Sequence, residues 1–488
     1  MTPGRPPSSS PEDTRLWAQH FHFRRHSNSA PSKQRICRKN TTASRVLTDG
    51  KDVIQASELQ DPPQYACLSY RWREVLEGVL TTTASNIRDH FRGIHVDRLP
   101  KTIMDAITVC RALDIAYLWV DALCIIQEDP DDFALEVARM DEIYANSHLT
   151  IYAKHAMSCK DDFLGPQTRG SQGWQRLSSV HSPSGRQCFI RTEHADENHA
   201  ARHVAALDTR GWCFQESMLP RRQLMYYGDE MVWKCQHSYL CECGHVLPDG
   251  HAHPAERSGL KRTWDDIMPP WMQTSDFSFF DHVSVWKDLV QDYSPRLLTR
   301  PTDKLAAVSG LARRLYDRSS PAEGSGGRDT FHAGLWGRNF VEQLSWVPTW
   351  SSPRRRLDND VPTSSWASIE GAVAYNSVSK GHFSPLSLLA QIRNVVCSPV
   401  HLDNPFGPVQ AGGYLDISPP LLPVKLAVLD EAERPGTLVY LMRGQGTRTP
   451  WIEVEVDVDA EISPLFRDPS ERRCPSDRTY CFARGCAC

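Results

Sequence analysis

The sequence lacks several features that would assign it to a special class of protein. None of its apolar runs approaches the roughly 18 residues that a membrane-spanning helix needs. The N-terminal stretch MTPGRPPSSSPEDTR has no apolar core, so we expect no signal peptide. The formal net charge is only -4, which gives no reason to expect nucleic acid as a partner. These absences predict a cytoplasmic protein with no membrane span.

Extremes of composition are also missing. Hydrophobic residues make up 40% of the 488 residues and charged residues 23%, as in ordinary globular proteins. The 15 cysteines are expected to be reduced thiols, because the cytosol keeps thiols reduced and a chain of this size needs no covalent staples. The chain is too long for one ordinary core, so we expect more than one domain.

Composition and periodicity divide the chain into five segments. The first is rich in Pro, Ser, Arg and Asn, shows little periodicity and is expected to be disordered. The predicted segments are a disordered N-terminal segment at 1–45, a first folded domain at 46–245, a mixed helical region at 246–359, a β-rich region at 360–460 and an irregular tail at 461–488.

The two regions after the first domain each contain one clear pattern. Residues 293–316 predict an amphipathic helix that Thr302 or Asp303 could cap. At 451–459 the sequence WIEVEVDVD alternates apolar and acidic residues, which is typical of a strand with one wet face.

The stretch at 117–153 predicts the central unit of the first domain. It begins with an almost continuously apolar run, interrupted by Asp121, which favours a buried strand at 117–124. A second short strand is predicted at 148–153. With a helix between them, the strands form a unit whose crossover is right-handed in nearly all proteins. We therefore expect two parallel strands of one sheet here.

The connecting helix is predicted at 130–145. Asp129 is placed to cap it, and Pro130 fits its first position. One face should pack on the sheet, with Glu136 on the opposite, exposed side. The residues of the packed face are Phe133, Val137, Met140 and Tyr144.

Two earlier segments complete a doubly wound parallel sheet. YACLSY at 65–70 predicts another buried strand, and a helix predicted at 100–114 leads to the strand that starts at residue 117. Alternating strands and helices predict an α/β fold, in which ligands bind outside the carboxyl ends of the strands. The loop after residue 69 and the segment 121–127 should both lie at that edge.

Polar and aromatic residues near this edge are candidates for a site, each with a structural alternative. Asp121 is either a buried structural carboxylate or a site residue, since a buried charge needs a partner or a function. Arg71 and Arg210 offer fixed bidentate geometry to phosphate or carboxylate, or else pair with Asp121 or Glu216. The tryptophans are core aromatics or ligand platforms: Trp72, Trp119 and Trp212. The cysteines among apolar residues are most simply small hydrophobes: Cys110, Cys124 and Cys213.

The segment CQHSYLCECGH at 235–245 is rich in the softer ligands that zinc prefers. They are Cys235, Cys241, Cys243 and His245. Their spacing fits no standard zinc finger, and two ligands separated by a single residue are awkward for a closed tetrahedral site. We therefore predict no metal site, while a metal-stabilised interaction domain stays open as one class of function.

Successive motifs resemble those of the fungal heterokaryon incompatibility (HET) domain family. They are LSYRW at 68–72, LWVDALCIIQED at 118–129, EIYANS at 142–147 and RGWCFQE at 210–216, in the order of the family. Arg73 stands where the family usually has glycine; if that glycine is needed for a tight turn, this loop must take another conformation. The resemblance implies a fungal protein that promotes programmed cell death in non-self recognition, with an incompatibility partner or self-association.

The sequence is also similar, more distantly, to the TIR domain, a flavodoxin-like doubly wound sheet. LSYRW matches its first motif, and WCFQE at 212–216 matches a motif whose glutamate supports cleavage of NAD at the nicotinamide ribosyl bond. This similarity implies Glu216 as the catalytic residue, with NAD as substrate and no cofactor. Alternatively, Glu216 caps a helix or pairs with Arg210 or Arg221. The candidate substrate-binding residues are Ser69, Tyr70, Arg71, Trp72, Asp121, Gln127, Arg210 and Trp212.

The enzyme hypothesis competes with a non-catalytic one. In the alternative, the domain self-associates or binds a partner and triggers cell death through downstream factors. The two hypotheses differ in whether Glu216 and an arginine share an open cleft at the carboxyl edge of the sheet.

Overall fold

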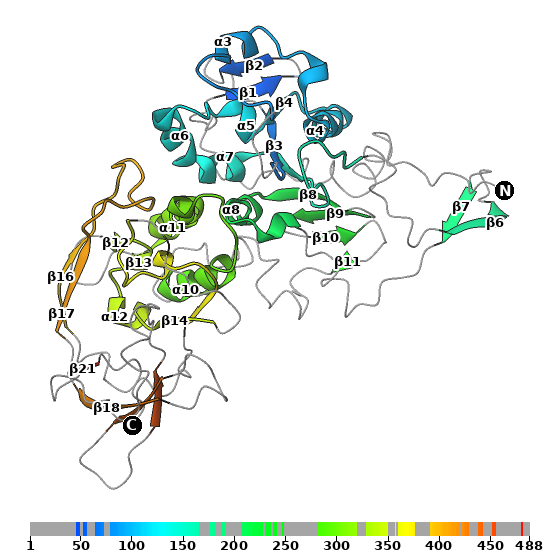
Figure 1. Cartoon of the computed structure of the whole chain (residues 1–488). Helices are drawn as coiled ribbons and strands as arrows, with labels where there is room; N and C mark the ends of the chain where they lie inside the picture. Colours follow the sequence, from blue (N-terminus) through cyan, green and yellow to red (C-terminus); the bar gives the residue numbers. More distant parts are fainter. Residues whose placement is uncertain are drawn as a thin grey trace. The chain divides into compact units, whose positions relative to one another are not determined.

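The structure, a computed structural model, consists of two compact units (Figure 1). The first comprises residues up to Phe280 together with Ala306–Arg314, and the second comprises Asp281–Leu305 and the chain from Leu315 onward. The residues that the structure describes are 45–48, 52–55, 64–72, 79–164, 175–181, 187–190, 206–227, 230–235, 238–241, 246–247, 282–319, 328–349, 357, 360–375, 391–418, 422–428, 438–442, 451–454 and 480–481. The predicted disorder of the N-terminal segment therefore falls, up to residue 44, outside the described residues.

The first unit is built on a sheet whose central strands are parallel (Figure 1). These strands are β3 (Tyr65–Ser69), β4 (Tyr117–Trp119), β5 (Leu149–Tyr152) and β8 (Arg222–Tyr227). Their order is β4-β3-β5-β8, so the chain moves to one side of β3 for β4 and to the other side for β5. The predicted α/β sheet is confirmed, and its topological switch point lies between β3 and β5, where such sheets bind ligands.

Antiparallel strands extend the sheet at both edges. Beyond β4 lies the hairpin of β1 (Arg45–Thr48) and β2 (Asp52–Gln55). Beyond β8 follow β9 (Glu230–Cys235), β10 (Ser238–Cys241) and β11 (Val246–Leu247). Within the described residues the sheet has nine strands, and it is mixed rather than wholly parallel. The described part of the unit also contains the separate hairpin of β6 (Gln175–His181) and β7 (Gln187–Ile190).

The helix predicted at 100–114 is confirmed as α4 (Lys101–Ala112). Its apolar face belongs to the core that it shares with the central strands, as the spacing of its hydrophobic residues predicts. The buried residues of this face include Ile103, Ala106, Ile107 and Cys110. Before it come the short α3 (Ile87–His90) and the 3-10 helix η2 (Val96–Arg98).

The strand predicted at 117–124 ends early. β4 stops at Trp119, and Asp121–Cys124 forms the short helix α5 instead. The Asp121 carboxylate accepts a hydrogen bond from the Ala122 backbone N–H at 2.7 Å. A carboxylate in the first turn of a helix offsets the partial positive charge of the free N–H groups, which favours helix over strand at this point. The prediction for the second half of the apolar run was therefore wrong.

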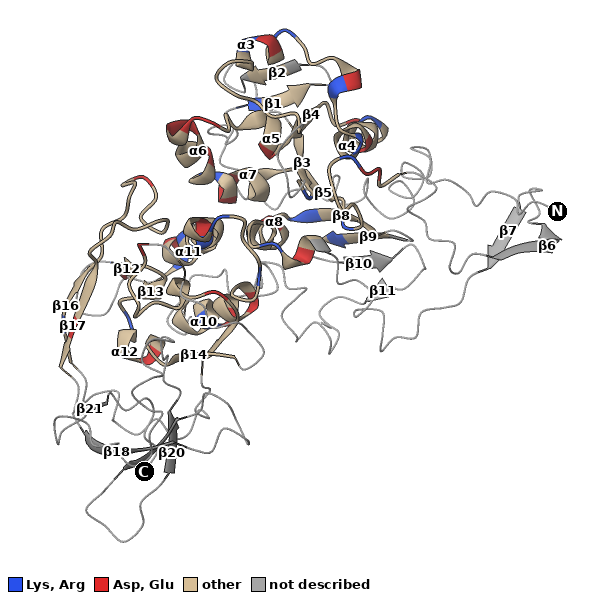
Figure 2. Cartoon of the chain, in the orientation of Figure 1, with Lys and Arg blue, Asp and Glu red and all other residues tan. Residues whose placement is uncertain are grey.

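The helix predicted at 130–145 is two helices, α6 (Pro130–Val137) and α7 (Met140–Asn146). The predicted cap is confirmed, because Asp129 accepts hydrogen bonds from two backbone N–H groups at the start of α6, where acidic residues gather (Figure 2). The predicted exposed side was wrong: Glu136 is buried, whereas Leu135 is 43% exposed. The break between the helices interrupts the continuous stripe on which that prediction depended.

The second unit has helices around an aromatic core. Its helices include α10 (His282–Tyr293), the 3-10 helix η8 (Pro301–Lys304) and α12 (Phe340–Gln343). Trp286 packs edge-on against Trp336 and Trp366, and all three are fully buried. The helix α11 (Ala306–Arg318) contributes its last residues to this unit and its first nine to the first unit. It begins later than predicted, because Thr302 and Asp303 lie in η8 rather than at its cap.

The described residues of the second unit also form short antiparallel strands, which confirms a mixed helical and β-rich C-terminal region. They are β12 (Phe331–His332), β13 (Leu335–Trp336), β14 (Trp346–Pro348), β15 (Val373–Tyr375), β16 (Gln391–Val396), β17 (Tyr414–Ser418), β18 (Leu422–Val428), β19 (Leu438–Met442), β20 (Trp451–Val454) and β21 (Tyr480–Cys481). The strand predicted at 451–459 is β20 as far as residue 454, and its remainder lies outside the described residues.

Candidate functional site

Glu216 lies at the switch point of the sheet, bonded to the ends of β3 and β5. It belongs to α8 (Trp212–Met218). Ser69, the last residue of β3, donates a hydrogen bond from its Oγ to the Oε2 of Glu216 at 2.5 Å. Tyr152, the last residue of β5, donates one from its hydroxyl to the backbone carbonyl of Glu216. The glutamate is thus fixed at the edge where ligands are expected, although only 5% of it is exposed.

Asp121 follows the adjacent strand, β4, and is bonded to the loop that follows β3. Trp72 donates from its indole Nε1 to both carboxylate oxygens of Asp121, at 3.1 and 3.0 Å. Gln127 donates from its side-chain amide to the backbone carbonyls of Asp121 and Ile125, both at 3.0 Å. The segment 121–127 and the loop after β3 therefore meet, as predicted from the carboxyl ends of neighbouring parallel strands.

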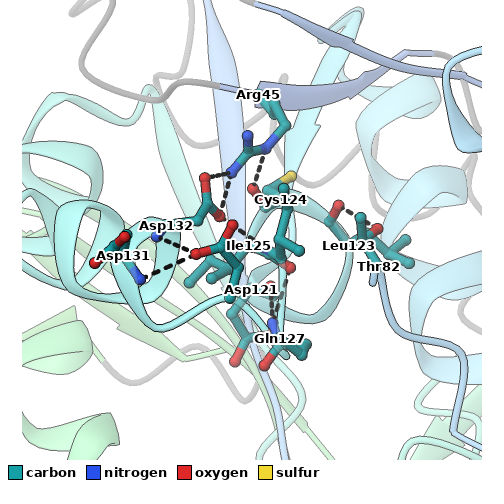
Figure 3. Close-up of polar contacts among 11 residues, drawn as sticks. Arg45, Thr82, Asp121, Leu123, Cys124, Ile125, Gln127, Asp131 and Asp132 are labelled. Carbon is teal, nitrogen blue, oxygen red and sulfur yellow. Dashed lines mark hydrogen bonds and ion pairs between the residues drawn. The ribbon is translucent and has the colours of Figure 1, made fainter. Parts of the chain in front are cut away.

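Arg45 of β1 binds the backbone of the segment 121–127 and the start of α6 (Figure 3). Arg45 donates from Nε to the Cys124 carbonyl at 2.7 Å, and from Nη2 to the two carboxylate oxygens of Asp132 at 2.6 and 2.5 Å. Asp132 also accepts a hydrogen bond from the Ile126 backbone N–H at 2.8 Å. One partly buried ion pair thus joins the hairpin, the segment after β4 and the start of α6.

Thr82 supports the same segment from another side (Figure 3). Its hydroxyl donates to the Leu123 carbonyl at 2.7 Å, and its backbone N–H donates to the Ala122 carbonyl at 2.8 Å. The Gln127 backbone N–H in turn donates to the Thr82 carbonyl at 2.9 Å. With this many bonds to its backbone, the segment presents Asp121 in a fixed position.

The two carboxylates have perturbed acidities. Burial raises the pKa of Asp121 to about 6, against hydrogen bonds from Ala122 and Trp72 that favour the charged form. Burial, reinforced by the negative charge of Asp121, raises the pKa of Glu216 to about 7, against the hydrogen bond from Ser69. Both groups can therefore exchange a proton near neutral pH, which is typical of acid–base and electrostatic catalysts.

Arg210 is the cation of this site. Its Nη1 donates to the Tyr70 carbonyl at 3.2 Å, and its charge opposes the rise in pKa of both Asp121 and Glu216. The Tyr70 side chain is buried, and this burial together with the charge of Asp121 raises the pKa of its phenol well above the ordinary value. The Glu216 carboxylate accepts a hydrogen bond from Ser69, and the described residues show no ion pair between it and Arg210 or Arg221, although the charge of Arg210 lowers its pKa.

Most of the candidate residues named from the sequence come together here. Ser69, Tyr70, Trp72, Asp121, Arg210 and Glu216 are linked by the contacts above, and Gln127 fixes the backbone beneath them. Trp212 instead packs edge-on against Phe133 of α6, with ring centroids 6.5 Å apart. Arg71 is half-buried, and its substrate-binding role stays a prediction. Arg73, the departure from the family pattern, lies outside the described residues.

Sequence reasoning missed an ion pair at the end of β5. Lys154 forms a buried ion pair with Asp208, in the 3-10 helix η4 (Ala206–Thr209) that precedes Arg210. Its position two residues after a buried strand, at the switch point, was a usable signal. Cys213 was weighed only as a small hydrophobe, and the structure shows it buried, where its thiol lowers the pKa of Glu216.

The described residues show no cluster of three or more His, Cys, Asp or Glu side chains that could hold a metal. Cys243 and His245 of the segment weighed for zinc lie outside those residues. Trp119 is fully buried, in agreement with its interpretation as a core aromatic. In the part of the chain that the structure describes, no helix has both the length and the apolar character to cross a membrane.

Comparison with known proteins identifies the part of the chain that contains this site. Residues 65–216 match the family model described as heterokaryon incompatibility protein (HET). A curated relative, heterokaryon incompatibility protein 6, OR allele, of Neurospora crassa, is 25% identical over 157 residues, which are 30% of this chain and 20% of the relative. The match thus spans about a fifth of the length of that relative. No solved structure matches the chain significantly. The segment from Tyr65 to Glu216, which begins with β3 and ends on the candidate carboxylate, is thus the part of the chain that matches the HET domain family.

Proposed function

We propose that the protein acts in heterokaryon incompatibility, and that its HET domain cleaves NAD between nicotinamide and ribose to trigger cell death. The observation that supports the activity is the meeting of Glu216, Ser69 and Asp121 at the switch point of a flavodoxin-like strand order. The role in incompatibility is supported by the family of residues 65–216 and by the name of the Neurospora crassa relative.

The proposed reaction needs one ionised carboxylate. As the bond to nicotinamide breaks, the electron pair leaves with the pyridine ring, which departs neutral and needs no general acid. Positive charge grows on the ribose carbon, and the Glu216 carboxylate stabilises it, as in glycoside hydrolysis. Water then adds to that carbon and releases a proton, giving ADP-ribose. Arg210 supplies a cation for the phosphates, and Trp72 an aromatic face for a base.

The acidity of Glu216 sets the expected pH dependence of this reaction. Because its pKa is raised to about 7, the carboxylate is only partly ionised at neutral pH. The rate of nicotinamide release should therefore increase as the pH rises through about 7, as the ionised form accumulates. A rate that falls over the same range would contradict the role of Glu216 as the stabilising anion.

The burial of Glu216 favours a competing function. At 5% exposure the carboxylate does not meet bulk solvent in this structure, so a substrate must open the edge of the sheet to reach it. A buried carboxylate bonded to Ser69 and held by Tyr152 can equally fix α8 to the sheet. In that case the domain is a non-catalytic module that acts through self-association or partner binding.

The deciding experiment is nicotinamide release from NAD by the purified full chain, measured over a wide range of protein concentrations. Glu216→Gln keeps shape and hydrogen bonding but removes the charge, and should lower the rate at least about 100-fold. The matched control is Glu128→Gln, an exposed position, which should keep the wild-type rate. Equal rates for wild type and a folded Glu216→Gln would exclude Glu216 as the catalytic group. A wild-type protein that self-associates without releasing nicotinamide would support the non-catalytic module.

A further inference from the structure

The first half of α11 packs on the HET domain although it lies about 90 residues after that domain's last residue. Residues Ala306–Arg314 belong to the first unit. Nearly all of these nine residues are buried, as expected of a helix that packs on other helices. The buried apolar ones are Ala306, Ala307, Val308, Leu311 and Ala312.

Gly310 marks the closest approach of α11 to the domain. A Cβ atom at Gly310 would lie 2.5 Å from the Cβ of Asp141, in α7, and 3.0 Å from the Oε1 of Gln215, in α8. Ordinary contacts between carbon atoms are about 3.5 to 4.0 Å, so there is no room for a methyl group. The backbone of α11 therefore lies directly against α7 at this point, and against the end of the Gln215 side chain of α8.

Arg314 provides a second contact on the same face of α11, one turn further on. Its Nε lies 3.8 Å from the Oδ2 of Asp141, and its Nη2 donates to the Asp141 carbonyl at 3.3 Å. Residues four apart on a helix lie on the same face, so Gly310 and Arg314 both contact Asp141. Asp141 is buried, which shields the ion pair from water.

The helix α8 is held from two directions. Gln215 contacts α11 and α7, where its amide also reaches the Met140 sulfur at 3.8 Å. Glu216, the next residue, contacts the ends of β3 and β5 through Ser69 and Tyr152. Because the two residues are consecutive in one short helix, a shift of α8 away from α11 displaces the Glu216 carboxylate as well.

We propose that α11 positions the candidate site: through Gly310, Asp141 and Gln215 it fixes the helix that carries Glu216. Gly310 and Arg314 are positioning residues, since they act through α7 and α8 and touch no reacting atom. This inference rests on the proposed function only where the test measures nicotinamide release; the packing of α11 on α7 and α8 does not depend on it. It extends the functional HET unit to a helix outside the residues matched by the family, 65–216.

The test is Gly310→Ala in the full chain. Alanine is the better helix former by about 1 kcal/mol, so any loss must come from the contact with α7 and α8. The added methyl group should push α11 and α7 apart by about 1 Å and displace the Gln215 side chain of α8 by a few tenths of an ångström, judged from ordinary contact distances. A displacement of about 1 Å can cost about 100-fold in rate, so the smaller shift of α8 should lower kcat for nicotinamide release roughly 10-fold, with KM little changed.

Hydrogen–deuterium exchange of the Trp212–Met218 amides supplies a readout that does not need enzymatic activity. Exchange of these amides should become faster in both Gly310→Ala and Arg314→Met. Arg314→Lys, which keeps the positive charge, should exchange more slowly than Arg314→Met. The matched control is Asp317→Ala, at an exposed position of the same helix, which should change neither exchange nor rate.

The outcomes separate the two proposals. Faster exchange in α8 together with a lower kcat supports the positioning role. Folded variants with unchanged exchange in α8 overturn it, whatever their activity. Faster exchange in a protein whose wild type releases no nicotinamide leaves the positioning of α8 intact and overturns the proposed reaction. If Gly310→Ala does not fold, the same exchange measurement on Arg314→Met and Arg314→Lys tests the positioning role instead.

Discussion

Removing the charge of Glu216 should change how stability depends on pH. Its pKa is raised from 4.5 to about 7, first by burial and then by the charge of Asp121. The folded protein therefore binds this proton more tightly than the unfolded chain does. The resulting stabilisation is fully present below about pH 4.5 and is lost as the pH rises through about 7.

The size of the effect follows from the shift. At about 1.4 kcal/mol per pKa unit, a shift from 4.5 to about 7 corresponds to about 3 kcal/mol, of which about 2 to 3 kcal/mol should be lost between about pH 5 and pH 8. The glutamine in Glu216→Gln cannot lose a proton. The free energy of unfolding of this variant should therefore not show the loss of about 2 to 3 kcal/mol between about pH 5 and pH 8. At pH 8 the variant should be the more stable protein.

Urea denaturation at pH 5 and pH 8, read by tryptophan fluorescence, measures both free energies of unfolding. Glu128→Gln controls for the loss of one negative charge, because Glu128 is exposed. In Asp121→Asn the free energy of unfolding should decrease less between pH 5 and pH 8 than it does in wild type, because the charge of Asp121 helps to raise the pKa of Glu216. Parallel pH profiles for wild type and Glu216→Gln would refute the reasoning, since the glutamate would then have no raised pKa.

Three further changes test the packing of each part. Met140→Asp should lower the free energy of unfolding by several kcal/mol in thermal or urea denaturation, because it buries an unpaired carboxylate, whereas Leu135→Asp at the exposed position of α6 should have little effect. Arg45→Met should cost about 1 to 3 kcal/mol in the same assay, because it leaves the half-buried Asp132 carboxylate without its cation; a loss under 1 kcal/mol would mean that the ion pair does not hold the segment. Gly334→Ala should destabilise the second unit, detected as a lower Tm, because its φ is +93° and the new methyl group would lie 2.9 Å from the Trp366 indole nitrogen; an unchanged Tm would contradict this.

The sequence predicted the centre of the fold because its signals there are local. Continuous apolar runs at β3, β4 and β5 indicate strands buried on both faces, and Asp129 followed by Pro130 marks the start of α6. The carboxyl-edge rule then placed Ser69 and Asp121 at neighbouring strand ends, as the structure shows.

Features that depend on distant residues were beyond the sequence patterns. The burial of Glu136 depends on the break between α6 and α7, for which the stripe of apolar residues gives no sign. Arg45 pairs with Asp132 across 87 positions, in a segment whose composition favoured disorder. Gly310 reads as an unfavourable residue within a helix until its contact with Asp141 is known.

The contacts of Arg45 and α11 bear on how the domain could be produced as a fragment. A fragment cut at the boundaries of the family match, 65–216, would lose the hairpin that carries Arg45 and the helix that covers Asp141 and Gln215. It would expose the β4 edge of the sheet to pairing with other chains, and would leave the half-buried carboxylate of Asp132 and the buried carboxylate of Asp141 without their arginines. Insoluble expression of such a fragment would then reflect missing parts of its fold, and a productive fragment has to begin before residue 45 and retain the helix at 306–318.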